Sequence, residues 1–227
     1  EIYSPDTLAI IDAGKSPEMR LTYKEWNQRV NRLANWLKNE VGVGYRDRVA
    51  ILAQDGIEHL DLLYACGKLG AIHTALNWRL HWRELVDIIE DTQPKALIYS
   101  DAFKSTVQDV EKATRETDVA IQHFLHIDGE GIPNSFRYEA TIQLAPATPV
   151  SYEALDKEDI ACLLFTGGTT GLPKGAQISH RQINWNVLNT VIHDLNHDDI
   201  YLCVFPLFHA GGLFAYLSSQ VVFGNTT

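Results

Sequence analysis

The sequence predicts an α/β fold in which a layered, largely parallel sheet is flanked by helices. Short continuous apolar runs, typical of strands buried on both faces, alternate along the chain with segments whose apolar residues recur at helical spacing. Strands that alternate with helices favour parallel pairing through right-handed crossovers. The chain has 227 residues, of which 45% are hydrophobic and 21% are charged. It is therefore long enough and apolar enough to enclose a core as one large domain or two small ones.

The predicted elements follow one another in chain order. Thr22-Tyr23-Lys24-Glu25 has the pattern of a capping box, and apolar residues continue from it at helical spacing, so we predict a helix over residues 22–39. The apolar run 48–53 predicts the first buried strand. The alternation then continues with a helix through Ile57 and Tyr64 that ends near Gly67 and Gly70, followed by an apolar segment at 71–76. The next predicted elements are a helix at 83–91, a strand at 96–99, a helix capped by Asp101 and a strand at 124–127.

The periodicity fails over residues 128–149, where glycine and proline cluster. This composition predicts a long surface connection. The only internal boundary that the sequence suggests is therefore a subdomain connection at 128–158.

The charge and cysteine content exclude several classes of protein. There are 29 Asp and Glu against 19 Lys and Arg, a formal net charge of −10, which opposes attraction to nucleic acid and to anionic membranes. The apolar stretch 213–223 is interrupted by polar residues and is shorter than the roughly 20 residues that a membrane-spanning helix needs. Cys66, Cys162 and Cys203 form no CxxC pair, so we expect no disulfide framework and a cytoplasmic location.

One glycine-rich segment carries the candidate chemistry. After the strand-like run 162–165 comes Thr-Gly-Gly-Thr-Thr-Gly-Leu-Pro-Lys-Gly at 166–175. Its glycines leave backbone N–H groups free to turn inward, its hydroxyls add donors and Lys174 adds a positive charge, which together suit a phosphate. The segment also fits a plain β-hairpin loop with 176–179 as the return strand. It is not a P-loop, because Pro173 and Gly175 replace that motif's second glycine and its Ser or Thr.

With its surroundings, this segment resembles the phosphate-binding signature of the AMP-forming adenylating enzymes, the family of acyl-CoA synthetases, aryl-CoA ligases, luciferases and peptide-synthetase adenylation domains. Ser179-His180 follows it, and other stretches resemble family landmarks in the right order: Leu-Thr-Tyr-Lys-Glu-Trp at 21–26, Lys-Leu-Gly-Ala-Ile at 68–72 leading to Leu-Asn-Trp-Arg-Leu at 76–80, and Phe-Pro-Leu-Phe-His-Ala-Gly-Gly-Leu at 205–213. The sequences at 76–80 and 205–213 are most similar to those of the fatty-acyl-CoA synthetase branch.

The resemblance implies a two-step ligation. A carboxylate attacks the α-phosphate of ATP, pyrophosphate leaves, and the acyl group then passes from the adenylate to the thiol of coenzyme A. The co-substrates implied are therefore ATP with Mg²⁺, coenzyme A and a small carboxylic acid, with a fatty acid favoured. The implied phosphate site consists of Thr166, Gly167, Gly168, Thr169, Thr170, Gly171 and Lys174.

Three residues of this site need further interpretation. Lys174 is also expected to be catalytic, because its ammonium would stabilise the departing pyrophosphate. Thr166 is the candidate Mg²⁺ contact and fits equally well an ordinary strand-end threonine. Gly167 stands where the family usually has Ser or Thr, which removes a hydroxyl donor worth about 1 kcal/mol.

The second implied site follows Pro206, at the end of a predicted strand. By resemblance, His209 would lie beside the substrate carboxylate and act in catalysis, with the alternative that it is a core histidine bonded to a backbone carbonyl. Gly211 and Gly212 would leave room for the acyl chain, or they are glycines at the start of a helix.

The resemblance covers the whole chain, but the family's adenine-stacking and ribose-binding motifs and its catalytic lysine are not in it. We therefore expect residues 1–227 to be an incomplete N-terminal AMP-binding domain without the C-terminal domain, inactive by itself. An apolar flank should then favour self-association or a homodimer. The competing hypothesis is a non-catalytic structural or partner-binding fragment whose phosphate loop has degenerated.

Overall fold

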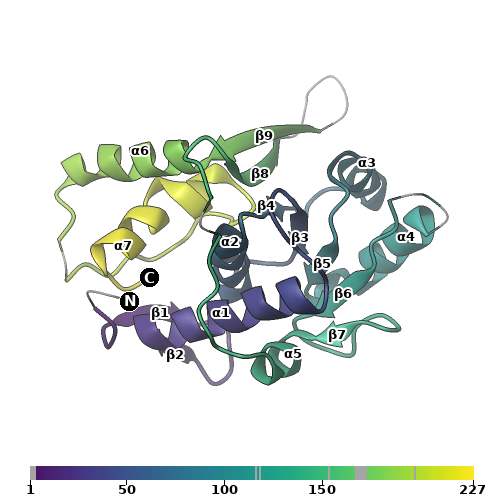
Figure 1. The fold of residues 1–227 in the computed structure, drawn as a ribbon, viewed down its shortest axis with the longest axis horizontal. Coiled ribbons are helices and arrows are strands. Elements are labelled where there is room, and N and C mark those ends of the chain that lie inside the picture. Colours follow the sequence, from purple (N-terminus) through teal and green to yellow (C-terminus); the bar gives the residue numbers. More distant parts are fainter. Residues whose placement is uncertain (1–3, 116, 118, 153, 167–172, 197) are drawn as a thin grey trace.

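The computed structural model describes residues 4–115, 117, 119–152, 154–166, 173–196 and 198–227. Two sheets form within them (Figure 1). The small one is an antiparallel pair near the N-terminus, and the large one has seven strands in the order β7-β6-β5-β3-β4-β8-β9. The strands are β1 (Leu8–Asp12), β2 (Met19–Thr22), β3 (Arg48–Leu52), β4 (Ile72–Ala75), β5 (Ala96–Tyr99), β6 (His123–His126), β7 (Phe136–Arg137), β8 (Ile160–Thr166) and β9 (Lys174–Ser179).

All pairs of neighbouring strands in the large sheet are parallel except β8 and β9, which are antiparallel. The predicted layered, largely parallel α/β architecture is therefore confirmed. The helices are α1 (Tyr23–Asn39), α2 (Ile57–Leu69), α3 (Trp82–Thr92), α4 (Lys104–Thr114), α5 (Tyr138–Leu144), α6 (His180–Thr190) and α7 (Leu217–Phe223), together with a π-helical turn at Gly211–Ala215.

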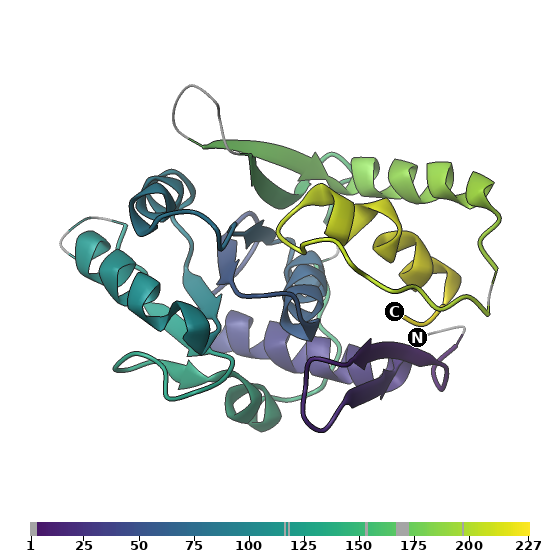
Figure 2. The same cartoon turned by 180° about the vertical axis from the view of Figure 1, so that it is seen from behind.

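Helices cover both faces of the sheet (Figures 1 and 2). Alternate residues of β3 point to opposite sides: Val49 and Ile51 belong to one core cluster with residues of α1, α2 and α5, and Ala50 and Leu52 belong to the other with residues of α3 and α4. This explains why the central strands read as continuous apolar runs, since both of their faces are buried.

Local signals position most elements as predicted. Thr22 caps α1: its hydroxyl accepts the Glu25 N–H at 3.3 Å, and the Glu25 carboxylate accepts the Thr22 N–H at 2.8 Å. Gly70 ends α2 in the left-handed conformation, with φ at 66°. No helix in the described residues is long and apolar enough to cross a bilayer.

The structure differs from the expectation in four places. Asp101 does not cap α4, because it begins a short 3-10 turn at Asp101–Phe103 and the N-cap of α4 is Phe103, without a side-chain bond. The strands β1 and β2 form a hairpin that the sequence analysis did not identify. Residues 128–149 are not merely a surface connection, because they contain β7 and α5, and the side chains of Tyr138 and Ile142 are buried. Residues 201–204 form no strand. Near them, the structure has a single isolated bridge between Ile200 and Thr226.

The large sheet continues on both sides of the predicted connection at 128–158, because β8 pairs with β4. The division into subdomains stays a prediction.

Candidate functional site

The glycine-rich segment connects the two antiparallel strands at one edge of the sheet. Thr166 ends β8 and lies opposite Lys174, the first residue of β9, and the Thr166 hydroxyl donates to the Lys174 carbonyl at 3.5 Å. Both residues are exposed. The hairpin confirms 176–179 as part of the return strand. Gly167, Gly168, Thr169, Thr170 and Gly171 lie outside the described residues, so their phosphate contacts stay a prediction.

The Ser-His pair after this hairpin is the start of α6. The Ser179 N–H donates to the Gln182 side-chain oxygen at 2.7 Å, and the Gln182 N–H donates to the Ser179 hydroxyl at 3.3 Å. This is a reciprocal capping box, so Ser179 has a structural role of its own. His180 is half-buried, and burial lowers its pKa.

Two landmark stretches that are more than one hundred residues apart in sequence meet at the carboxyl edge of the sheet. Trp78 and Arg79 follow β4. The Trp78 ring packs edge-on against Phe208, with centroids 6.0 Å apart, and the Arg79 guanidinium lies 4.9 Å from the centroid of Trp78 and 5.7 Å from that of Phe208. Because β4 is the neighbour of β8, this cluster flanks the strand that leads into the glycine-rich segment.

His209 is exposed on a tight turn directly after Phe208. The backbone N–H of Gly211 lies 3.1 Å from His209 Nδ1. Since a backbone N–H can only donate, Nδ1 must be the acceptor, and the neutral ring carries its proton on Nε2. His209 therefore offers an outward N–H donor. The alternative of a buried core histidine bonded to a backbone carbonyl does not describe this side chain.

The two glycines after His209 shape the turn. A Cβ at Gly212 would lie 2.3 Å from the Pro206 carbonyl oxygen, so only glycine permits this approach. Gly211 begins the π-helical turn, in agreement with the helix-start alternative. Their role in admitting an acyl chain stays a prediction.

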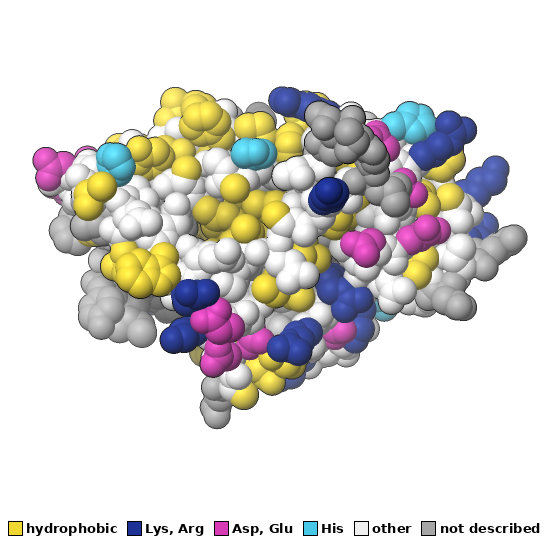
Figure 3. Space-filling model, turned by 90° about the horizontal axis from the view of Figure 1, so that it is seen from above, with side chains coloured by type: hydrophobic (Ala, Val, Ile, Leu, Met, Phe, Trp, Pro, Cys, Tyr) yellow, Lys and Arg dark blue, Asp and Glu magenta, His cyan; other side chains and the backbone are white. Residues whose placement is uncertain are grey.

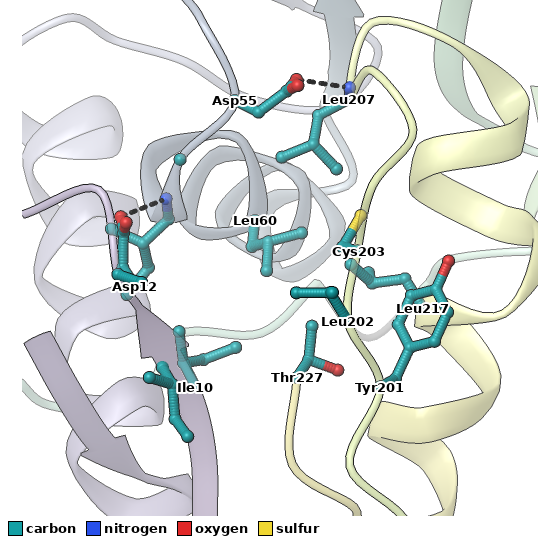
Figure 4. Close-up of a pocket in the computed structure, with 14 residues that line it drawn as sticks. Ile10, Asp12, Asp55, Leu60, Tyr201, Leu202, Cys203, Leu207, Leu217 and Thr227 are labelled. Carbon is teal, nitrogen blue, oxygen red and sulfur yellow. Dashed lines mark hydrogen bonds between the residues drawn. The ribbon is translucent and has the colours of Figure 1, made fainter.

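A contact that the sequence analysis missed joins this turn to the sheet. Asp55, in the loop between β3 and α2, accepts the Leu207 N–H at 2.7 Å (Figure 4). The contact lies beside a cavity of about 210 Å³ whose lining includes Ile10, Leu60 and Leu217. No local pattern marks Asp55, because its partner is 152 residues away in sequence.

The strongest pKa shifts occur in the core, away from this edge. Asp61 is fully buried and accepts bonds from Arg29 Nε at 2.5 Å, Tyr138 Oη at 3.0 Å and Trp26 Nε1 at 3.1 Å. Burial raises the pKa of Asp61 to about 6, against the lowering effect of Arg29. Arg29 also forms a two-pronged ion pair with Glu139. This network ties α1, α2 and α5 together, which indicates a structural role.

A second buried group lies around His73. Its Nδ1 is 3.3 Å from Cys162 Sγ, and the rings of His73 and His59 are 6.4 Å apart. Burial lowers the pKa of His59 to about 4 and that of His73 to about 3, and burial raises the pKa of the Cys162 thiol well above its usual range. A buried thiol that is hard to ionise is inert, so Cys162 has a structural role. Within the described residues, no group of three or more His, Cys, Asp or Glu is arranged to hold a metal ion.

Comparison with known proteins extends these observations. The model of a family described as AMP-binding enzyme matches residues 3–227. An indoleacetate–CoA ligase from Aromatoleum aromaticum is 33% identical over 224 residues, covering 92% of this chain and 40% of that protein. A long-chain-fatty-acid–CoA ligase from Thermus thermophilus is 34% identical over 194 residues, covering 84% of this chain and 34% of that protein.

A solved structure agrees with the sequence comparisons. ATP-bound MatB from Rhodopseudomonas palustris superposes with a TM-score of 0.82 at 26% identity, covering 98% of this chain and 42% of that one. The chain therefore spans about two fifths or less of the length of these relatives. Because the family model covers almost all of the sequence and the fold agrees, the chain belongs to the family of AMP-binding enzymes.

Proposed function

We propose that this chain is part of an AMP-forming acid–thiol ligase, which activates a carboxylate with ATP and transfers the acyl group to coenzyme A. The observation that carries the proposal is that the hairpin and the His209 turn are both connected to the carboxyl ends of two neighbouring strands, β8 and β4. Lys174 and Thr166 begin and end the strands of the hairpin, and the His209 turn packs on the Trp78 cluster that follows the neighbouring strand β4. Parallel α/β sheets present their ligand-binding groups at this edge.

Lys174 and Thr166 fit the phosphates of ATP. The Lys174 side chain forms no ion pair with a carboxylate of the described residues, so its ammonium is free for a phosphate oxygen. With the chain's net charge of −10, such a local cation is what an anionic ligand needs. Among the described residues, the Thr166 hydroxyl donates one long bond, to the Lys174 carbonyl, which leaves its lone pairs for Mg²⁺. Mg²⁺ bound to ATP would neutralise phosphate charge as pyrophosphate leaves.

His209 is assigned to the carboxylate. Its Nε2–H points away from the Gly211 amide that occupies Nδ1, so it can donate to a carboxylate oxygen and orient that group toward the α-phosphate. In the first step a carboxylate oxygen forms a bond to the α-phosphorus while the bond to the pyrophosphate oxygen breaks. In the second step the thiol of coenzyme A displaces AMP from the acyl-adenylate.

A fatty acid is the proposed substrate, because the stretches 76–80 and 205–213 favour the fatty-acyl branch. The names of the relatives include both indoleacetate and a long-chain fatty acid, so an aryl acid is the competing outcome of the assay. The reaction is proposed to take place in the cytoplasm.

Self-association is proposed from the exposed apolar side chains around α6 and the segment that follows it. Several are more than half exposed: Trp185, Leu188, Ile192, Ile200, Leu202, Val204 and Phe205. Figure 3 looks onto the side of the molecule where α6 lies and shows hydrophobic side chains gathering there. Analytical sedimentation should give a dimer or larger species. A monodisperse monomer across the micromolar range would contradict this.

The phosphate role is tested by calorimetric titration of the chain with Mg-ATP and with Mg-pyrophosphate. Lys174→Ala should weaken binding by about 10- to 100-fold, the effect of losing one charge-assisted contact. Lys112→Ala removes another exposed lysine, from α4, and should change nothing. Equal affinities for the wild type and Lys174→Ala would refute the role of Lys174. Failure of the wild type to bind either ligand would favour the non-catalytic fragment.

The ligase activity requires the whole protein that carries this chain. Pyrophosphate release is measured with palmitate and with indoleacetate, each with and without coenzyme A. Release that depends on the acid supports the ligase, and the preferred acid identifies the substrate class. Release that is independent of any acid would contradict the proposal.

A further inference from the structure

The turn that carries His209 is held in shape by its own bonds. The His209 N–H donates to the Pro206 carbonyl at 3.0 Å, and the N–H groups of Gly212 and Leu213 donate to the His209 carbonyl at 3.0 and 3.1 Å. These contacts all lie within eight residues. They define the direction of the imidazole relative to the turn, but they do not attach the turn to the sheet.

Two kinds of contact attach the turn to the sheet, and Leu207 and Phe208 are also part of the large core cluster. The first is apolar: Phe208 packs on Trp78 after β4. The second is polar, and it is the bond of 2.7 Å from the Leu207 N–H to Asp55 Oδ1 (Figure 4). Apolar packing has no strong directional preference, whereas a short bond to a carboxylate fixes the direction of the Leu207 amide, two residues before His209.

Asp55 does not have the role that its position suggests. An aspartate just before a helix commonly accepts an N–H of the first turn. Here Gly56 is the N-cap of α2 without a side-chain bond, and the Ile57 N–H donates instead to Asp12 Oδ2 at 3.2 Å. Asp12 thus caps the helix from β1, and the Asp55 carboxylate reaches across the chain to Leu207.

Loss of this acceptor has a defined consequence. Leu207 is 5% exposed, whereas Asp55 is exposed and borders the cavity, so the Leu207 N–H would lose its partner at a partly buried position. An unpaired buried donor is unfavourable, and the turn would move to find another acceptor. Any such movement displaces His209 with it.

We propose that Asp55 is a positioning residue for His209, which it holds against the carboxyl edge of the sheet through the Leu207 amide. The inference rests on the proposed function, because that function gives His209 its task. A carboxylate that must be aligned with the α-phosphate tolerates little displacement, and a shift of about 1 Å is enough to lower a rate by about 100-fold.

The geometry is tested without reference to activity. Nitrogen NMR of the chain should show distinct Nδ1 and Nε2 signals for His209 and a slowly exchanging Leu207 amide. Asp55→Ala should make that amide exchange at least 10-fold faster and change the chemical shifts of the two ring signals, because the turn keeps its own bonds but moves into different surroundings. Asp55→Asn keeps an oxygen acceptor and should preserve both features. Unchanged signals in Asp55→Ala, or no rescue by Asp55→Asn, would overturn the proposal.

The catalytic effect is tested in the whole protein by acid-dependent ATP–pyrophosphate exchange. Asp55→Ala should lower kcat by about 10- to 100-fold with little change in KM for ATP. In a double-mutant cycle it should add almost nothing to His209→Ala, because both act through one group. Additive losses would overturn the proposal.

Asp128→Ala is the matched control for both measurements. Asp128 is an exposed loop aspartate after β6 that accepts the Asp101 N–H at 2.5 Å, so it has the same type of contact away from His209. It should leave the exchange rate and the His209 signals unchanged, and a loss equal to that of Asp55→Ala would overturn the proposal. If the wild type shows the expected NMR signals but no acid-dependent exchange, the proposed function fails while the geometry stands.

Discussion

The two buried histidines should make the folded chain sensitive to mild acid. His59 and His73 are both fully buried, and His59 Nδ1 and His73 Nε2 have no hydrogen-bond partner in the part of the chain that the structure describes. Burial lowers the pKa of His59 to about 4 and that of His73 to about 3. Each pKa is lower in the folded chain than in the unfolded chain. The contribution of the two neutral histidines to the free energy of unfolding is therefore complete above pH 6.5. It is lost as the pH falls from 6.5 toward those values.

The magnitude follows from these pKa values. At pH 5 an unfolded imidazole is almost fully protonated while the folded one is not, so each histidine lowers the free energy of unfolding by ~2 kcal/mol, or ~4 kcal/mol for the pair. Asp61 acts in the opposite direction. Burial raises its pKa to about 6, so its protonation in the folded chain returns ~1 kcal/mol over the same interval. The net loss of ~3 kcal/mol is a large part of the stability of an ordinary domain.

Urea unfolding followed by tryptophan fluorescence at pH 7, 6 and 5 measures this loss. The comparison of wild type with His73→Leu isolates one histidine, because contributions common to both proteins cancel in the difference. His73→Leu should lose ~2 kcal/mol less than the wild type between pH 7 and pH 5, and His59→Leu provides an independent second case. Parallel profiles for the wild type and both variants would refute the reasoning.

Two further predictions concern the core network and the turn. Arg29→Met should lower the free energy of unfolding by about 3–5 kcal/mol, because it leaves the Asp61 carboxylate buried without its charge partner; a loss below about 1 kcal/mol in urea unfolding would contradict this. Gly212→Ala places a Cβ 2.3 Å from the Pro206 carbonyl oxygen and should speed hydrogen exchange across the turn. Gly67→Ala meets nothing within 4 Å on α2 and should raise stability by about 1 kcal/mol. If Gly212→Ala and Gly67→Ala changed the free energy of unfolding equally, the steric argument would be contradicted.

Elements whose signal is local were predicted from the sequence. The capping box at Thr22 and the left-handed glycine at Gly70 determine a helix start and a helix end within a few residues of chain. The central strands were recognised because they are buried on both faces and so read as apolar runs. By contrast, α5 has seven residues, of which two are buried, which is too few to establish a helical period.

The candidate site residues were predicted by resemblance, but the contacts that hold them were not. The pattern at 205–213 identified His209, whereas Asp55 stands in an ordinary helix-start position and makes its contact 152 residues away. Ser179 illustrates the opposite case. Ser179 belongs to one of the stretches that resemble the family, and in the structure it caps the start of α6. Any helix that begins at this position would require such a cap.

Sheet topology explains why residues so far apart converge. The strands β4 and β8 are parallel neighbours, so whatever follows them must emerge side by side at the same edge. Trp78 follows β4 and packs on Phe208, and this contact brings in the third stretch, which has no strand of its own in that sheet. The His209 turn is thus attached by the packing of Leu207 and Phe208 and by the bond to Asp55 rather than by a ladder of strand pairing. A change in either contact should therefore disturb His209 before it disturbs the hairpin that carries Lys174.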